Sequence, residues 1–134
     1  MKKVIYVIIL IVIVIGVGLV FSMKDRNQEN KQPIRYVSMD EIKETMNENT
    51  DYIILDARTI EEYNEGHIPN AICIPNETID ESVTSKLPRK DQLILIYCRS
   101  GNRSKQAATK LANLGYTNLV EFGGVIDWDG EIVR

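Results

Sequence analysis

The first feature of the hydrophobic pattern is an unbroken apolar run of 18 residues, from Val4 to Phe21, directly after Lys2 and Lys3. As an α-helix rising about 1.5 Å per residue, this run reaches roughly 27 Å, close to the thickness of bilayer hydrocarbon. A buried strand would be much shorter. The pattern therefore predicts one N-terminal transmembrane helix, with residues 1–23 as a membrane anchor.

A cleaved signal peptide is the alternative interpretation of this segment. Such peptides usually have an apolar region of about 7–15 residues before a small-residue cleavage site. This run is longer, although Val20 and Ser22 form a weak cleavage pair. The two lysines before the run favour an N-terminus inside the cell, and we expect the following domain to lie outside the cytoplasm. Lys24, Arg26 and Lys31 lie on the other flank, so a cytoplasmic domain is the alternative orientation. The wholly polar residues 24–32 predict a flexible linker.

Beyond the linker, short apolar runs alternate with amphipathic stretches. The pattern predicts strands at 34–37, 52–55, 71–74, 93–97 and 119–122, with helices between them. Residues 93–97 (LILIY) are apolar throughout, which is typical of a central strand covered on both faces. Regular alternation of strands and helices predicts an α/β domain with a mainly parallel sheet over residues 33–134.

Short sequence motifs predict where several of the helices begin or end. Ser38 with Glu41, and Thr59 with Glu62, have the spacing of capping boxes at helix starts. Residues 77–86 predict a weaker helix, and 104–114 an amphipathic helix that ends at a glycine.

Charge and cysteine content restrict the function. Residues 33–134 contain 11 basic and 17 acidic residues, a net charge of −6, which argues against a nucleic acid as partner. The chain has two cysteines, Cys73 and Cys98. Two cysteines make neither a disulfide framework nor a zinc-site pattern, so a catalytic thiol is the interpretation of interest.

Cys98 has the position expected of a reactive group. It directly follows the most apolar predicted strand, and ligands of parallel sheets bind beyond the carboxyl ends of strands. The segment 98–104 (CRSGNRS) leads into a helix, so backbone N–H groups and the helix N-terminus can surround an anion. Arg99 and Arg103 add positive charge. These features favour thiolate over thiol, without requiring a histidine base.

The same segment resembles the active-site loop of the rhodanese-like family. Residues 55–75 (LDARTIEEYNEGHIPNAICIP) resemble its amino-proximal signature, and Phe122-Gly123-Gly124 with Trp128 resembles its closing segment. The resemblance covers residues 33–134. It implies the rhodanese-like α/β fold, with a mainly parallel five-stranded sheet flanked by helices.

The resemblance also implies a sulfurtransferase. A donor such as thiosulfate or a persulfide would load sulfur onto Cys98, and cyanide, a thiol or a protein acceptor would remove it. No metal or organic cofactor is implied. The spacing Cys-x4-Arg is one residue shorter than in phosphatases and arsenate reductases of related fold, which disfavours those activities. A non-enzymatic or thiol-redox module at the membrane is the remaining alternative.

Six residues are predicted to bind substrate around the nucleophile. Arg99 would orient an anionic donor, and the loop residues would act through backbone N–H groups. Arg103 would either bind donor or brace the loop, and Arg58 would approach the pocket rim. The full set is Arg99, Ser100, Gly101, Asn102, Arg103 and Arg58.

Structural roles are expected for the other polar and aromatic residues of the signatures. We expect an ion pair or loop hydrogen bond for Asp56 and a hydrogen bond in a turn for His67. Cys73 is interpreted as a small core residue, with attack on a modified Cys98 as an alternative. Trp128 and the glycines before it are expected to pack and turn the C-terminal segment.

Overall fold

The apolar run at the start of the chain forms a helix, α1 (Lys2–Arg26). The structure, a computed structural model, describes residues 1–26 and 32–134, without the side chains of residues 19–26. Within these limits, no helix combines the length and the apolar character needed to cross a membrane. The predicted transmembrane helix is therefore not supported. The apolar run counted in the sequence ends at Phe21, beyond the last side chain described in α1.

The predicted linker at 24–32 overlaps the end of α1, and its residues 27–31 lie outside the described residues. Residues 1–31 and 32–134 form two units. The second unit contains all the remaining elements.

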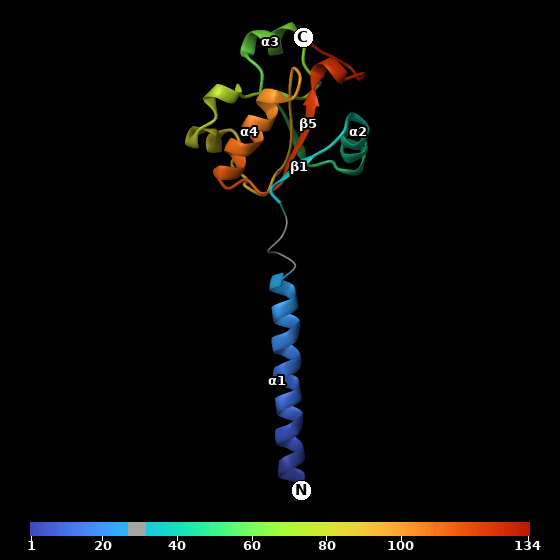
Figure 1. The fold of residues 1–134 in the computed structure, drawn as a ribbon, viewed down its shortest axis with the longest axis vertical. Helices are drawn as coiled ribbons and strands as arrows, with labels where there is room; N and C mark the ends of the chain where they lie inside the picture. The colour runs from blue at the N-terminus through green and yellow to red at the C-terminus, as the bar shows by residue number, and fades with distance from the viewer. Residues whose placement is uncertain (27–31) are drawn as a thin grey trace. The chain divides into compact units, whose positions relative to one another are not determined.

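Residues 32–134 contain a five-stranded sheet of order β1-β5-β4-β2-β3 (Figure 1). All four neighbouring pairs in this sheet are parallel, which confirms the predicted α/β class. The strands are β1 (Ile34–Tyr36), β2 (Tyr52–Asp56), β3 (Ile72–Cys73), β4 (Leu93–Cys98) and β5 (Leu119–Gly124). All six residues of the central strand β4 are buried, as its apolar sequence predicted.

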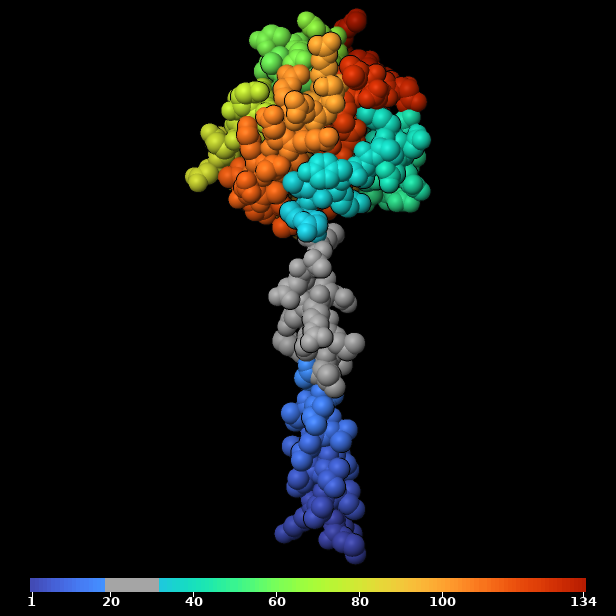
Figure 2. Space-filling view, viewed as in Figure 1, coloured from blue at the N-terminus to red at the C-terminus, as the bar shows by residue number. Residues whose placement is uncertain are grey.

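Helices cover both faces of the sheet and create two cores. On one face, α4 (Asn102–Asn113) packs Ala107, Ala108 and Leu111 against Ile94 and Ile96. Orange atoms, in the colour range that includes α4, make up part of the visible surface of this unit in Figure 2. On the other face, α2 (Met39–Glu48) packs on Leu95, Tyr97 and Val120. The alternation of side chains along β4 thus divides it between the two cores.

Two helix starts have the predicted capping boxes. Ser38 caps α2 with Glu41, and Thr59 caps α3 (Ile60–Glu65) with Glu62. In each box, the hydroxyl accepts from the N–H of the glutamate, whose carboxylate accepts from the N–H of the capping residue. These ends follow from local hydrogen bonds, so the sequence alone predicted them.

The predicted helix at 77–86 is wrong. The segment forms two 3₁₀ turns instead, η1 (Asn76–Thr78) and η2 (Glu81–Ser85). The Asp80 carboxylate accepts from the N–H of Ser82, and Thr84 and Ser85 donate their hydroxyl hydrogens to nearby carbonyls. Such local bonds compete with α-helical bonds, which accounts for the shorter turns. A third 3₁₀ turn, η3 (Val125–Asp127), follows β5.

The strand–helix junction at Cys98 is tighter than predicted. Cys98 is the last residue of β4 rather than the first beyond it, and pairs with Gly124 after an irregularity in register. The helix α4 begins at Asn102, two residues before the predicted start. Gly101 caps it with φ of 102°, a left-handed conformation that favours glycine. Only three residues therefore separate the nucleophile from the helix.

Candidate active site

The Cys98 sulfur is buried and surrounded by hydrogen-bond donors. The residue is 1% exposed, and the Gly101 N–H donates to Sγ over 3.0 Å. Burial by itself raises the pKa of the thiol. The hydroxyl and N–H of Ser104 and the N–H groups of Gly101 and Ser100 outweigh it, so that the pKa of Cys98 lies below its ordinary value. The site therefore favours a thiolate.

The loop after Cys98 rests directly on β5. A Cβ at Gly124 would lie 2.1 Å from the Arg99 carbonyl oxygen and 2.5 Å from Ser100 Cα. Only glycine permits this approach, and the N–H of Ile126 donates to the same Arg99 oxygen over 3.3 Å. The glycine of the closing segment therefore positions the nucleophile loop, in addition to turning the chain.

Two residues of this site were missed in the sequence. Ser104, fully buried on α4, has its Oγ 2.5 Å from Glu121 Oε1 and 3.0 Å from the Gly101 carbonyl oxygen. Glu121 on β5 is 3% exposed and also accepts from the N–H of Gly123 over 2.9 Å. One signal was available: Glu121 is the only charged residue in the apolar run 119–122. Its proximity to Ser104 depends on how β5 and α4 pack.

The predicted substrate-binding residues of the loop fall into two groups. Arg99, Ser100 and Asn102 are exposed beside the buried sulfur. Arg103 is partly buried and forms two hydrogen bonds with the Glu62 carboxylate, of 2.7 and 2.9 Å. Of its two predicted roles, the structure provides the bracing one, since this ion pair ties α4 to α3.

The guanidinium of Arg58 is buried, and its N–H groups donate to other groups of the protein. Nη2 donates to Asp56 Oδ2 over 2.6 Å and to the Gly66 carbonyl over 2.7 Å. The Tyr97 hydroxyl donates to the same carboxylate over 2.6 Å. These contacts give Arg58 a structural role and argue against the predicted contact with substrate, whereas the ion pair expected for Asp56 is confirmed.

His67 makes the structural contacts expected of it. Nδ1 lies 2.9 Å from the Tyr63 carbonyl oxygen, and the two rings stack with centroids 3.7 Å apart. Its backbone pairs with that of Val133. The histidine thus ties the turn after α3 to the C-terminal segment.

Cys73 is an unactivated thiol on the opposite face of the sheet from Cys98. Asp56 pairs in register with both Cys73 and Tyr97, so these three side chains share a face, and Cys98 is directed to the other. Burial, followed by the charge of Asp56, raises the pKa of Cys73 to about 11. Both observations argue against the alternative in which Cys73 attacks a modified Cys98.

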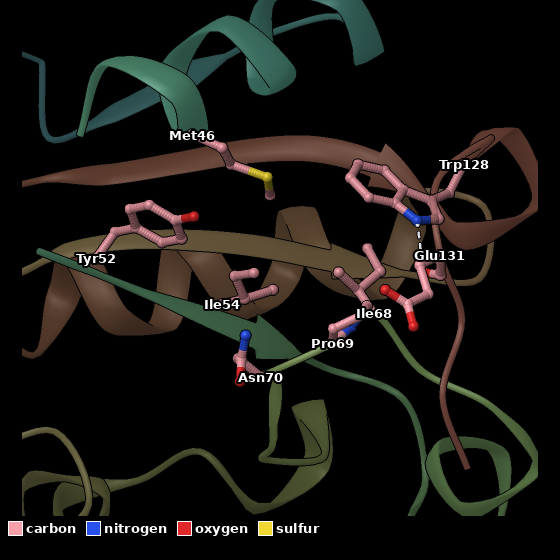
Figure 3. Close-up of a pocket in the computed structure, with 8 residues that line it drawn as sticks. All are labelled: Met46, Tyr52, Ile54, Ile68, Pro69, Asn70, Trp128 and Glu131. Atoms are coloured by element: carbon pink, nitrogen blue, oxygen red, sulfur yellow. Dashed lines mark hydrogen bonds between the residues drawn. The ribbon is translucent and has the colours of Figure 1, made fainter. Parts of the chain in front are cut away.

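A separate pocket of about 220 Å³ lies between α2, β2 and the C-terminal segment (Figure 3). Met46, Tyr52 and Ile54 line it together with Trp128, whose indole N–H donates to the Glu131 carbonyl. None of its lining residues belongs to the Cys98 loop, and its volume is below the range of about 300–1,000 Å³ usual for small-molecule sites. Trp128 also packs near Phe122, with ring centroids 6.4 Å apart. We therefore assign this pocket no part in the chemistry.

A metal centre finds no support in the described part of the chain. It contains no group of three or more His, Cys, Asp or Glu side chains placed to hold a metal ion.

Comparisons with known proteins agree with this geometry. The model of the Rhodanese-like domain family matches residues 38–131. The thiosulfate sulfurtransferase PspE of Escherichia coli is 34% identical over 73 residues, which cover 54% of this chain and 70% of that protein. Sulfur transfer is therefore supported at the level of the family.

Two further matches extend over more of the chain. The putative sulfur carrier protein YrkF of Bacillus subtilis is 31% identical over 108 residues, 80% of this chain and 57% of that protein. The chain thus spans little more than half the length of this relative. A rhodanese-like domain protein from Staphylococcus aureus superposes with a TM-score of 0.60 at 32% identity, covering 72% of this chain and 93% of that one.

Proposed function

Because the chain belongs to the rhodanese-like domain family, we propose that it is a sulfurtransferase that carries sulfane sulfur as a persulfide on Cys98. The observation that carries the proposal is the buried sulfur with the Gly101 N–H 3.0 Å away and its pKa below the ordinary value. A thiolate is the nucleophile in such chemistry, and the same donors stabilise the anionic terminal sulfur of a persulfide.

The reaction proceeds by double displacement. The Cys98 thiolate attacks the outer sulfur of thiosulfate, an S–S bond forms to the enzyme, and sulfite leaves with the electron pair of the broken bond. Cyanide or a thiolate then attacks the terminal sulfur of the persulfide. The thiocyanate or the new persulfide departs, and Cys98 returns as thiolate. Both steps balance without an external oxidant or reductant.

In this scheme, the loop residues attract the anionic donor and leave the sulfur open to the acceptor. Arg99 is exposed beside the nucleophile and attracts an anionic donor such as thiosulfate. Ser100 and Gly101 act through N–H groups that face the sulfur, and Asn102 is exposed at the start of α4. The exposed loop also leaves room for a protein acceptor to approach the persulfide.

The Arg103–Glu62 pair argues against phosphatase or arsenate reductase activity. Those reactions need a guanidinium that is free to bind a tetrahedral oxyanion. Here both terminal nitrogens of Arg103 donate to the Glu62 carboxylate. The compact ring of residues from Cys98 to Arg103 suits a single sulfur atom.

Thiocyanate formation from thiosulfate and cyanide tests the proposal, with intact mass recording any sulfur adduct on Cys98. Turnover and a sulfur adduct in the wild type, both lost in Cys98→Ser, would support it. If neither thiocyanate nor an adduct forms, a non-enzymatic or thiol-redox module becomes the better interpretation. A matched control is Cys73→Ser, which removes the other thiol and should keep both signals.

For localisation, we propose attachment to the cell membrane through residues 1–23, with the sulfurtransferase domain outside the cytoplasm. The support is the apolar run of the sequence and the exposure of its large side chains from Val4 to Val17 on α1. Cell fractionation tests attachment, and protease added to spheroplasts tests the side. A mature protein that begins near Met23 in the soluble fraction would refute the anchor.

A further inference from the structure

Residues 92–120 differ in charge from the rest of the unit 32–134. This segment runs from β4 through the Cys98 loop and α4 to the first residues of β5. It has no acidic residue, and its basic residues are Arg99, Arg103, Lys105 and Lys110. The rest of the unit contains seven basic and 17 acidic residues. Positive charge is therefore concentrated on the nucleophile loop and on the helix that follows it.

A groove on the outer side of α4 contains the two lysines of this segment. It has a volume of about 400 Å³. Its lining residues, which we call the basic groove, are Asn102, Lys105, Gln106, Thr109 and Lys110. Positions three or four apart share one side of a helix, and the buried residues of α4 lie between them. Asn102 begins α4, so the groove runs from the Cys98 loop along about 12 Å of the helix axis.

Both lysines keep their charge without an acidic partner. None of the ion pairs between described residues involves Lys105, Lys110 or the exposed Arg99 of the loop. Lys105 is exposed. Lys110 is partly buried, and its Nζ donates to the Asn76 carbonyl oxygen over 2.7 Å. This contact fixes the ammonium group but does not neutralise it.

Arg103 does not contribute a free charge to the same surface. Glu62 pairs with its guanidinium at 2.7 Å, and the charge of Glu77 on η1 also interacts with it. Glu77 itself takes part in none of the ion pairs between described residues. The positive charge open to a partner therefore comes from the two lysines and from Arg99.

We propose that the basic groove docks an acidic segment of a protein that accepts sulfur from Cys98. The proposal rests on the proposed function, since it names the acceptor of the persulfide. The thiolate of this protein attacks the terminal sulfur, and the S–S bond to Cys98 breaks with its electron pair remaining on Cys98. Thiosulfate and cyanide are much shorter than the groove. A polypeptide can place carboxylates along it while its thiol reaches the nucleophile.

An acidic protein fits this groove better than a nucleic acid or an anionic membrane. Both of those present phosphate charge over areas much larger than the groove. On a chain whose residues 33–134 have a net charge of −6, most of that phosphate would meet acidic surface. A protein can confine its carboxylates to a patch of matching size, and the acidic residues elsewhere disfavour docking at another surface.

Acceptor peptides test the charge preference with the full chain. One peptide has a run of glutamates about three residues from its cysteine, a separation of roughly 10 Å when extended. Its matched control has glutamines instead. With thiosulfate as donor, mass spectrometry of the persulfidated peptide gives kcat/KM for each. We expect about fivefold preference for the glutamate peptide at low salt. The preference should vanish near 1 M salt, where charges are screened beyond about 3 Å.

Lys105→Glu tests the groove itself, because the exposed Lys105 takes no part in the sulfur chemistry. This variant should lose the preference for the glutamate peptide and keep thiocyanate formation from cyanide at saturating thiosulfate. The matched control is Arg35→Glu, an equal change of charge at an exposed position of β1, which should keep the preference. Equal kcat/KM for the two peptides in wild type, or equal losses in the two variants, would overturn the proposal.

Binding distinguishes this proposal from the proposed function. Fluorescence anisotropy measures binding of a labelled glutamate peptide that has serine in place of cysteine, and Lys105→Glu should weaken it. If that binding is observed but no acceptor receives sulfur, the proposed function and the acceptor role fail, while the groove remains a docking site for acidic protein. If thiocyanate forms but binding does not depend on Lys105, only the docking proposal fails. Binding of an RNA oligonucleotide or of anionic vesicles in place of the peptide would also overturn it.

Discussion

At the residue scale, the reactivity of Cys98 depends on hydrogen-bond donors from the loop and from Ser104. The only histidine is engaged in a structural turn, so the site has no imidazole base for the thiol. Acidity must then come from stabilisation of the anion, which the lowered pKa of Cys98 reflects.

Ser104→Ala should make Cys98 less reactive near neutral pH. Loss of the hydroxyl removes a donor that lowers the pKa of Cys98, so the thiolate will form only at higher pH than in wild type. The loss of one hydrogen bond to a charged group should slow alkylation of Cys98 roughly tenfold. The measurement is iodoacetamide alkylation against pH, followed by intact mass. Ser104→Thr keeps the hydroxyl and should restore the rate; a Cys98 profile unaffected by Ser104→Ala would contradict this account.

Cys73→Ser should leave thiocyanate turnover within about twofold of wild type, because its side chain is directed to the other face of the sheet. Its pKa of about 11 keeps it a thiol at neutral pH. Steady-state kinetics with thiosulfate and cyanide provide the measurement. A loss of turnover comparable to that of Cys98→Ser would restore a resolving role for this thiol.

At the element scale, the contact of the Cys98 loop with β5 predicts a strong effect of Gly124→Ala. The added Cβ would overlap the Arg99 carbonyl, so the loop must shift and its N–H groups leave the sulfur. We expect turnover to fall at least tenfold, with about 1–3 kcal/mol lost in unfolding free energy. Gly115→Ala is the control. It has φ of 96° with open space around it, and should cost about 1 kcal/mol without loss of turnover.

The ion pair between α3 and the start of α4 predicts a change in acid stability. The hydrogen bond from Arg103 lowers the pKa of Glu62 from 4.5 to about 2, and this effect outweighs the burial of the carboxylate, which by itself would raise the pKa. Because the folded pKa is depressed, this stabilisation is complete above pH 4.5 and is lost as pH falls toward 2.

The variant Glu62→Gln should therefore unfold with a smaller dependence on pH across that window. At neutral pH it should be less stable by about 1 kcal/mol, the magnitude usual for partly exposed pairs. Urea unfolding at neutral and acidic pH measures both effects. Glu61→Gln, one residue away on α3, is the matched control. If the free energy of unfolding depended on pH equally in Glu62→Gln and wild type, the ion pair would not be the source of the acid sensitivity.

The sequence predicted the features that depend on near neighbours. The spacing of residues a few positions apart predicted the capping boxes at Ser38 and Thr59. The alternation of apolar and polar segments predicted the parallel sheet and the position of Cys98 at a strand end. Residues 77–86 were misassigned because side-chain bonds from residues such as Asp80 compete with helix. The contact of Glu121 with Ser104 was missed because the two residues are 17 positions apart in the sequence. They meet only through the packing of α4 on β5, which the sequence pattern does not give.

At the scale of the whole molecule, residues 32–134 hold both cores and every group of the candidate site. The buried apolar side chains, the sheet and the Cys98 loop all belong to this unit, and residues 1–31 form a unit of their own. We therefore expect the two units to unfold independently.

A chain that begins at Gln32 should keep the thermal midpoint of the full chain within about 2 °C. Its thiocyanate turnover should also be unchanged, since no residue of the site lies before β1. Circular dichroism and steady-state kinetics on both chains, in the same detergent-containing buffer, measure the two properties. Because a difference of 1 kcal/mol moves the midpoint of a domain of about 100 residues by roughly 4–8 °C, a contribution from residues 1–31 would be detected. A lower midpoint in the shorter chain would mean that the N-terminal unit stabilises the sulfurtransferase fold.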